Sequence, residues 1–158
     1  MKIGALEISP SLLAINPHLR EVAPQTRRSR PRATLGTPTV RRDGGGFHVE
    51  ISGLALKLSL NSRVHWGEHA RIVKRQRAVV RTVLATHRPP SLPCVVTLTR
   101  VGPRELNDDN ATGTCKGTRD EVAAWLGTTD EDPRVTWRVE QAIGAYAVRI
   151  DIQTREDR

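Results

Sequence analysis

One long segment, residues 67 to 87, limits what this chain can fold into. Its apolar side chains recur along one side and most of its arginines and lysines fall elsewhere, which is the pattern of an amphipathic helix covering a hydrophobic core. Pro89 and Pro90 follow the segment and end the helix, because proline lacks the backbone N–H that a helix requires. Three β-prone runs flank it: Phe47 to Ile51, Leu54 to Leu60 and Cys94 to Arg100.

A second, shorter helix is expected from Lys116 to Leu126, with Thr112 or Thr114 as its N-cap. The last two β-prone runs are expected to form a hairpin: residues 135–141 and 146–152. Together these segments predict an α+β fold, in which two helices pack on a small mixed sheet of four to five strands.

The N-terminal part differs in composition from the remainder. Residues 1 to 43 contain five prolines, and eight lysines and arginines face three acids, a local net charge of 8 − 3 = +5. Large apolar side chains are too few there to offset the entropy lost on ordering. The three glycines at 44–46 are typical of a flexible joint. The sequence therefore predicts a basic, flexible arm over residues 1–46 and one folded domain over residues 47–158.

Charge and cysteine content restrict the partners. The net charge of +8 and the pI of about 10.7 favour a polyanion, nucleic acid before membrane. No stretch approaches the roughly 18 apolar residues of a membrane span, so no membrane partner is expected. Cys94 and Cys115 follow no secretory signal, which predicts reduced thiols in the cytoplasm, buried in the core.

Two acidic clusters mark the candidate site. Asn107 to Asn110 directly follow a β-prone run, and Asp130 to Asp132 follow the second helix. Carboxylates that meet from separate segments stay ionised when a cation lies between them, and Mg²⁺ or Mn²⁺ suits oxygen ligands of this kind. A helix of about ten residues spans only about 15 Å, so the sequence predicts that the two clusters fold towards each other.

The order and spacing of these features resemble the RusA-type Holliday junction resolvases, which include many phage and prophage proteins. The resemblance covers roughly residues 50 to 150, and three pieces carry it: Leu106-Asn107-Asp108-Asp109-Asn110 with Lys116, Trp125-Leu126-Gly127 with Asp130 to Val135, and Asn61 to Trp66 before the basic helix. It implies a Mg²⁺-dependent, structure-selective endodeoxyribonuclease. Such an enzyme hydrolyses phosphodiesters in branched DNA, such as a four-way junction, as a homodimer.

The resemblance also implies roles for particular residues. Carboxylates at the positions of Asp109 and Asp132 look like metal ligands, and Lys116 looks like an active-site cation. The family has an acid where this chain has Asn107, whose carbonyl can bind a metal but brings no charge. Asn107 or Asp108 is expected to complete the ligand set. Residues expected to hold the DNA backbone are Asn61, Arg63, Arg71, Lys74, Arg75, Arg100 and Arg104.

Two alternatives to the nuclease stay open. Asn107 favours a DNA-binding protein of the same fold whose cleavage is weakened or lost. A basic RNA-binding domain is the other, although the chain lacks the interleaved aromatic side chains that stack on unpaired bases.

Overall fold

The computed structural model describes residues 34–56 and 66–155, all within one compact unit. The predicted α+β fold is confirmed: the described elements are two helices and five strands. In chain order they are β1 (Thr39–Asp43), β2 (Gly46–Ser52), α2 (Trp66–Ala85), β3 (Cys94–Gly102), α3 (Asp108–Trp125), β4 (Val135–Ile143) and β5 (Ala147–Thr154). The predictions for residues 1–33, for the end of the Leu54 to Leu60 run, and for Asn61 and Arg63 lie outside the described residues.

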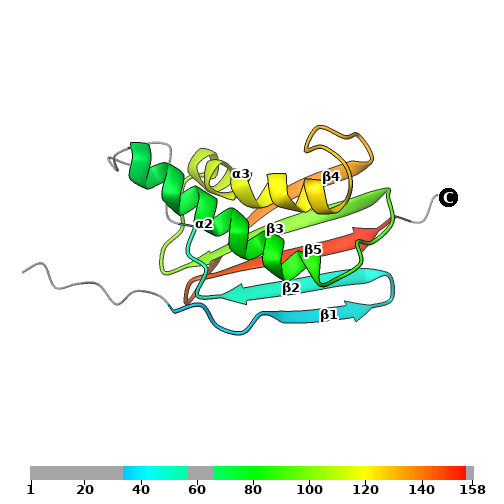
Figure 1. Cartoon of the computed structure of the whole chain (residues 1–158), viewed down its shortest axis with the longest axis horizontal. Helices are drawn as coiled ribbons and strands as arrows, with labels where there is room; N and C mark the ends of the chain where they lie inside the picture. Colours follow the sequence, from blue (N-terminus) through cyan, green and yellow to red (C-terminus); the bar gives the residue numbers. More distant parts are fainter. Residues whose placement is uncertain (1–33, 57–65, 156–158) are drawn as a thin grey trace, which may run out of the picture. The chain divides into compact units, whose positions relative to one another are not determined.

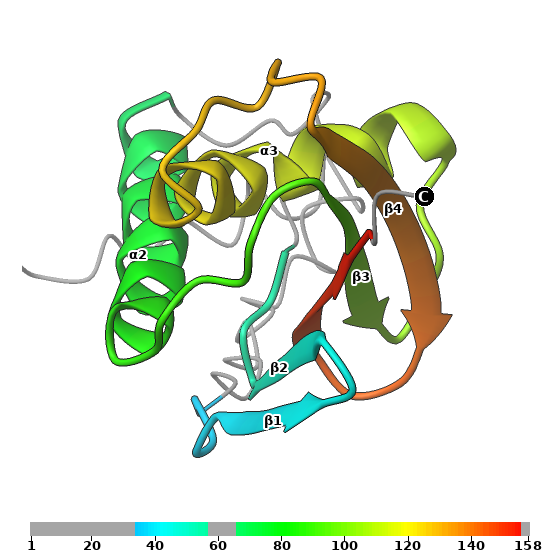
Figure 2. The ribbon, with the colours of Figure 1, turned by 90° about the vertical axis from the view of Figure 1, so that its right-hand side faces the viewer.

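The strands form a single sheet in the order β1-β2-β5-β3-β4. Neighbouring strands are antiparallel except β3 and β4, which run parallel. Both helices lie on the same face of the sheet (Figures 1 and 2), and the opposite face carries no helix of the described residues. The helix expected over residues 67–87 is α2, so the prediction from its hydrophobic pattern is confirmed.

The core lies between the sheet and the two helices. Alternate side chains of each strand point into it, because successive residues of a strand face opposite sides. Full burial of an aliphatic or aromatic side chain contributes roughly 1.5–3 kcal/mol, so the apolar residues of the inner face hold the layers together. The largest completely buried apolar side chains include Phe47, Ile51, Val80, Leu84, Leu98, Ile150 and Ile152.

The glycines at 44–46 form a tight turn instead of the predicted flexible joint. Asp43 pairs with Gly46 across the β1–β2 hairpin, and the two residues between them, Gly44 and Gly45, have positive φ angles of 41° and 90°. Two-residue hairpin turns require this geometry, which glycine adopts without steric cost. The folded unit therefore includes β1, and the predicted boundary at residue 46 was wrong.

The predicted C-terminal hairpin was also wrong. β4 and β5 do not pair with each other, because β3 lies between them and pairs with both. The short connection from β4 to β5 passes the end of β3, where the Gly144 N–H donates to the Gly102 carbonyl at 2.9 Å. A short connection alone favoured a hairpin, whereas the parallel β3–β4 pairing requires β5 to cross to the other side of β3.

Candidate functional site

Helix α3 begins inside the first acidic cluster. Asn107 is its N-cap residue, with an extended backbone, and Asp108 and Asp109 occupy its first turn. Carboxylates are favourable there because they face the positive end of the helix dipole. The prediction that the helix begins at Lys116, capped by Thr112 or Thr114, was wrong. Threonine and glycine are weak helix formers, and their abundance at 112–114 concealed the first two turns.

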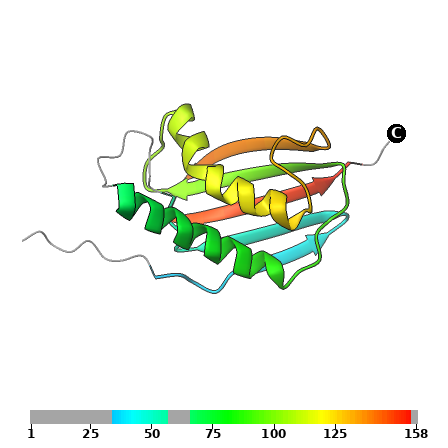
Figure 3. The same ribbon diagram turned by 45° about the horizontal axis from the view of Figure 1, so that its top comes forward.

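The first acidic cluster begins this longer helix, and the second cluster follows its end. Eighteen residues of α-helix span about 27 Å, and Asp109 lies in the first turn while Asp132 lies beyond the last. Figure 3 shows α3 running along the sheet with its two ends far apart. In the described part of the chain, no three His, Cys, Asp or Glu side chains converge closely enough to hold a metal ion.

The Asp132 carboxylate is occupied by its own loop. It accepts hydrogen bonds from the Arg134 backbone N–H at 2.9 Å, from Arg134 Nη2 at 2.7 Å, and from the Thr128 hydroxyl. The hydrogen bonds of the Arg134 side chain, followed by that of Thr128, hold the pKa of Asp132 well below its usual range. In one chain Asp132 thus fixes the turn that leads into β4.

In the first turn of α3, by contrast with Asp132, the carboxylates are exposed. The Asn107 carbonyl accepts from the Asn110 amide, so this side chain is engaged within the turn. Asp108 and Asp109 are exposed and form no hydrogen bond or ion pair with another described residue. Two such carboxylates and an amide carbonyl are suitable oxygen ligands for Mg²⁺, which usually keeps several waters and needs few protein ligands.

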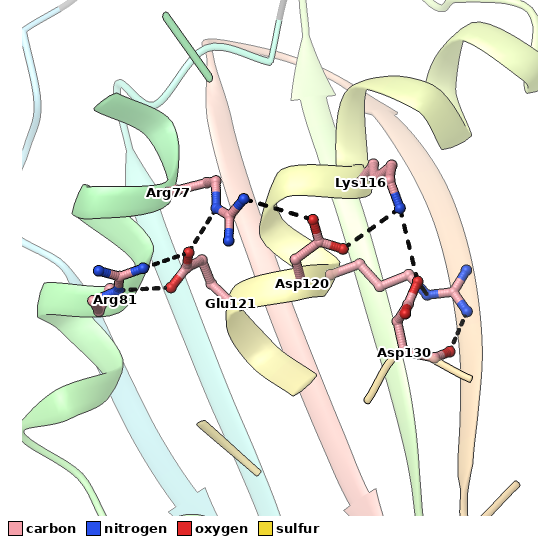
Figure 4. A network of polar contacts seen from close by, with 7 residues as sticks. Arg77, Arg81, Lys116, Asp120, Glu121 and Asp130 are labelled. Carbon is pink, nitrogen blue, oxygen red and sulfur yellow. Dashed lines mark hydrogen bonds and ion pairs between the residues drawn. The ribbon is translucent and has the colours of Figure 1, made fainter. Parts of the chain in front are cut away.

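Lys116 lies on the same side of α3 as Asp109, since seven residues make almost two full turns and about 10 Å of rise. Its ammonium is 3.7 Å from Asp120 Oδ1 and 3.9 Å from Asp130 Oδ2 (Figure 4). Arg119 holds Asp130 in place by donating from Nη2 to its backbone carbonyl at 2.6 Å. Of the second acidic cluster, Asp130 and not Asp132 therefore reaches Lys116.

The same network continues to α2 through Glu121, whose side chain is 3% exposed. Arg77 Nε donates to Glu121 Oε1 at 2.7 Å, and Arg81 donates from Nε and Nη2 at 2.9 Å each. The hydrogen bonds of Arg81, and then those of Arg77, lower the pKa of Glu121. Sequence reasoning missed Asp120 and Glu121, although Lys116 and Asp120 have the i, i+4 spacing of a helical ion pair.

Four of the residues predicted to bind DNA are exposed in the structure. Arg71, Lys74 and Arg75 are exposed along α2, and Arg104 is exposed just before α3. Their side chains form no ion pair with another described residue, so their charges are available to phosphate. Contact with DNA stays a prediction for these four.

Arg100 has a structural position instead. It is 4% exposed, and its Nε and Nη1 donate at 3.0 Å to the backbone carbonyls of Leu56 and Arg104. Its guanidinium therefore ties the segment after β2 to the segment before α3. The prediction that Arg100 binds the DNA backbone is corrected by this burial, because a side chain filling the interior is not available to a phosphate.

Two further groups of residues complete the description. Cys94 and Cys115 are buried in the core, as predicted, and burial raises the pKa of the Cys115 thiol to about 11.

On the uncovered face of the sheet, His48 Nδ1 lies 2.7 Å from Asp151 Oδ1 and Nε2 lies 3.0 Å from Asp43 Oδ1. The hydrogen bond to Asp151 is the main cause that raises the pKa of His48. The imidazole ring thereby links β1, β2 and β5.

No family model matches this chain, and no curated protein matches it. Among the described residues, no helix has both the length and the apolar character needed to cross a membrane. The class that the fold and the polar surface define is an α+β protein with a one-sided five-stranded sheet and a charged helical layer. Its function must be argued from its own residues.

Proposed function

We propose that this protein is a divalent-metal-dependent endodeoxyribonuclease that nicks branched DNA, such as a four-way junction, in the cytoplasm. The observation that carries the proposal is the pair of exposed carboxylates Asp108 and Asp109, which have no partner in the described chain although the protein is strongly basic. Their oxygen atoms are therefore available to a cation. Mg²⁺, or Mn²⁺ in its place, is the ligand that their oxygen atoms fit.

The chain supplies the remaining parts of a phosphodiesterase. A bound divalent cation polarises a phosphoryl oxygen and activates a water. The exposed ammonium of Lys116 stabilises negative charge that develops on the phosphorus centre, and Asp120 and Asp130 keep it on the face of α3 that carries Asp109. Arg71, Lys74 and Arg75 neutralise phosphates along the duplex arms. A homodimer suits a four-way junction, because two symmetric sites nick opposed strands.

A second candidate is a junction-binding protein that does not cut. Asn107 brings no charge to the first turn, and its carbonyl is engaged by Asn110. Asp132, the other predicted ligand, is engaged by Arg134 and Thr128. These two observations favour the binding protein, whereas the unpaired Asp108 and Asp109 favour the nuclease.

A four-way junction assay distinguishes the two candidates. Nicking is followed in Mg²⁺ and in Mn²⁺, and junction affinity is measured by gel shift at one fixed salt concentration. We expect Asp109→Asn to lower nicking by roughly 100-fold or more, because a group that stabilises the transition state is lost. Junction affinity should change by less than about twofold, because no phosphate contact is lost. Glu105→Gln, an exposed acid just before α3, is the matched control and should leave nicking unchanged.

The remaining outcomes assign the function. Salt-sensitive binding without nicking by the wild type, together with nicking by Asn107→Asp, establishes the second candidate. Equal nicking by the wild type and Asp109→Asn contradicts the proposed site.

A further inference from the structure

Each of the two carboxylates that contact Lys116 also contacts an arginine (Figure 4). Asp120 has one oxygen 3.7 Å from Lys116 Nζ and the other 3.9 Å from Arg77 Nη1. Asp130 Oδ2 lies 3.9 Å from Lys116 Nζ and 3.8 Å from Arg119 Nε. Neither acid is therefore left without a cation when the lysine turns away.

The network to which Lys116 belongs holds one more cation than it holds acids. Ion pairs join four basic and three acidic side chains: Arg77, Arg81, Lys116, Arg119, Asp120, Glu121 and Asp130. Without the ammonium of Lys116, three positive charges face three negative charges. The lysine is therefore the excess charge of the network, and its side chain is 70% exposed.

The two arginines that share these acids are anchored by shorter contacts. Arg77 Nε donates to Glu121 Oε1 at 2.7 Å. Arg119 Nη2 donates to the Asp130 backbone carbonyl at 2.6 Å, and its guanidinium carbon lies 5.0 Å from the centre of the Trp137 ring. Both ion pairs of the ammonium are longer than a hydrogen bond. An anion can thus draw the ammonium away while the arginines stay in place.

Arg119 also has a donor that is not in use. Its Nε is buried and donates no hydrogen bond to another described residue. Buried donors without an acceptor are uncommon in folded proteins, because they lose their hydrogen bonds to water and gain none in return. The nearest carboxylate oxygen of Asp130 is 3.8 Å from this nitrogen. A small movement of the carboxylate therefore completes a hydrogen bond to Arg119 once Lys116 has left.

We propose that Arg119 is a positioning residue for Lys116: it shares Asp130 with the ammonium, and it takes over this carboxylate when Lys116 turns to an oxygen of a bound phosphodiester. The release of Lys116 stands on the geometry of the network, whereas the phosphodiester as its target rests on the proposed nuclease function. Without Arg119, Asp130 keeps Lys116 as its one cation in the described part of the chain, and the ammonium is held back from the substrate.

Rescue by a second substitution separates this role from a purely structural one. At saturating protein, Arg119→Ala should lower the nicking rate roughly tenfold, less than the loss of about 100-fold from removing a transition-state group outright. Arg119→Ala/Asp130→Asn should nick within about threefold of the wild type, because the carboxylate that holds Lys116 back is gone and the two changes are coupled. A structural role predicts no recovery, since the second change removes a further contact. Arg155→Ala removes the same charge from an exposed position outside the network and should leave the rate unchanged.

Arg119→Gln guards against a loss of folding, which circular dichroism detects. Glutamine can still donate to the Asp130 carbonyl but brings no charge. Arg119→Gln should therefore show the same nicking defect as Arg119→Ala, and the same recovery with Asp130→Asn.

The ammonium can also be followed without any cleavage. In protein that carries isotope-labelled lysine, the NMR signal of the Lys116 ammonium is assigned by its absence from Lys116→Arg. Its hydrogen exchange with water should slow in Arg119→Gln, where Asp130 holds it more tightly, and should return to the wild-type rate in Arg119→Gln/Asp130→Asn. Unchanged exchange in Arg119→Gln, or a nicking defect that Asp130→Asn does not repair, overturns the proposal. A wild type that never nicks but shows this pattern of exchange refutes the proposed function and leaves the sharing of Asp130 intact.

Discussion

The two halves of the polar network on the helical layer are held together very differently. Around Glu121 the nitrogen–oxygen distances are 2.7–2.9 Å, and the carboxylate is almost completely buried. Around Lys116 the distances to Asp120 and Asp130 are 3.7 and 3.9 Å, and the lysine side chain is 70% exposed. Each half includes one carboxylate of α3, Glu121 in the first and Asp120 in the second, so position on that helix does not explain the difference.

The two halves differ in the contacts that their charged side chains make. Glu121 lies between α2 and α3, where short charge-assisted hydrogen bonds fix one helix against the other. Lys116 points to solvent from α3, and its contacts are longer than hydrogen bonds. An ammonium held this loosely keeps its capacity to bind an anion. We therefore propose that the Glu121 half serves stability and the Lys116 half serves function.

The largest expected effect comes from Lys116→Ala. Nicking of a four-way junction should fall by roughly 100-fold, because one group that stabilises the transition state is lost. The free energy of unfolding should change by less than about 0.5 kcal/mol, since exposed ion pairs contribute little. Nicking kinetics and urea denaturation measure the two quantities, and Lys116→Arg, which keeps the positive charge, is the control. A large loss of stability in Lys116→Ala would remove the distinction between the two halves.

Glu121→Gln should show the opposite pattern. We expect it to lower the free energy of unfolding by about 2 kcal/mol, the order of magnitude for hydrogen bonds to a buried charged group. Nicking per folded molecule should stay within about twofold of the wild type. Urea denaturation at pH 7, with the slope checked for two-state behaviour, provides the measurement.

The pH dependence of this difference tests its electrostatic origin. The folded-state pKa of Glu121 is lowered below 4.5, so its contribution is complete above pH 4.5 and is lost as the pH falls through the folded-state value. The gap between wild type and Glu121→Gln should therefore narrow on acidification from pH 7 to about pH 3. A gap that stays constant over this range would indicate lost packing and not a lost charge.

The fold could be predicted for several segments with a clear hydrophobic pattern. The strand expected from Leu54 was wrong over its described part, because Leu54 to Leu56 lie in no strand. The 3.6-residue period over 67–87 identified α2, and the apolar runs at Phe47 and Cys94 identified β2 and β3. The strand order could not be predicted, because it depends on pairings between distant segments. The parallel β3–β4 pairing and the crossing of β5 leave no local signal.

The candidate site was predicted in composition but not in arrangement. Asp109 was expected in the loop before the helix, because the weak helix formers at 112–114 hid the start of α3 at Asp108. The second acidic cluster does fold back along α3 as far as Lys116, but through Asp130. Asp130, not Asp132, accompanies Lys116, because Arg134 and Thr128 take the Asp132 carboxylate. Such competition between neighbouring partners depends on loop geometry that a sequence does not specify.

The smallest expected effect is that of Asp120→Asn, at the junction of the two halves. Its carboxylate lies 3.7 Å from Lys116 and 3.9 Å from Arg77, both longer than a hydrogen bond. Because its side chain is 28% exposed and salt screens such pairs, the free energy of unfolding should fall by no more than about 0.5 kcal/mol. Urea denaturation at low salt and at 1 M salt should show even this difference vanish at high salt. A loss as large as that of Glu121→Gln would mean that Asp120 belongs to the tight half, and the Lys116 half would then be structural as well.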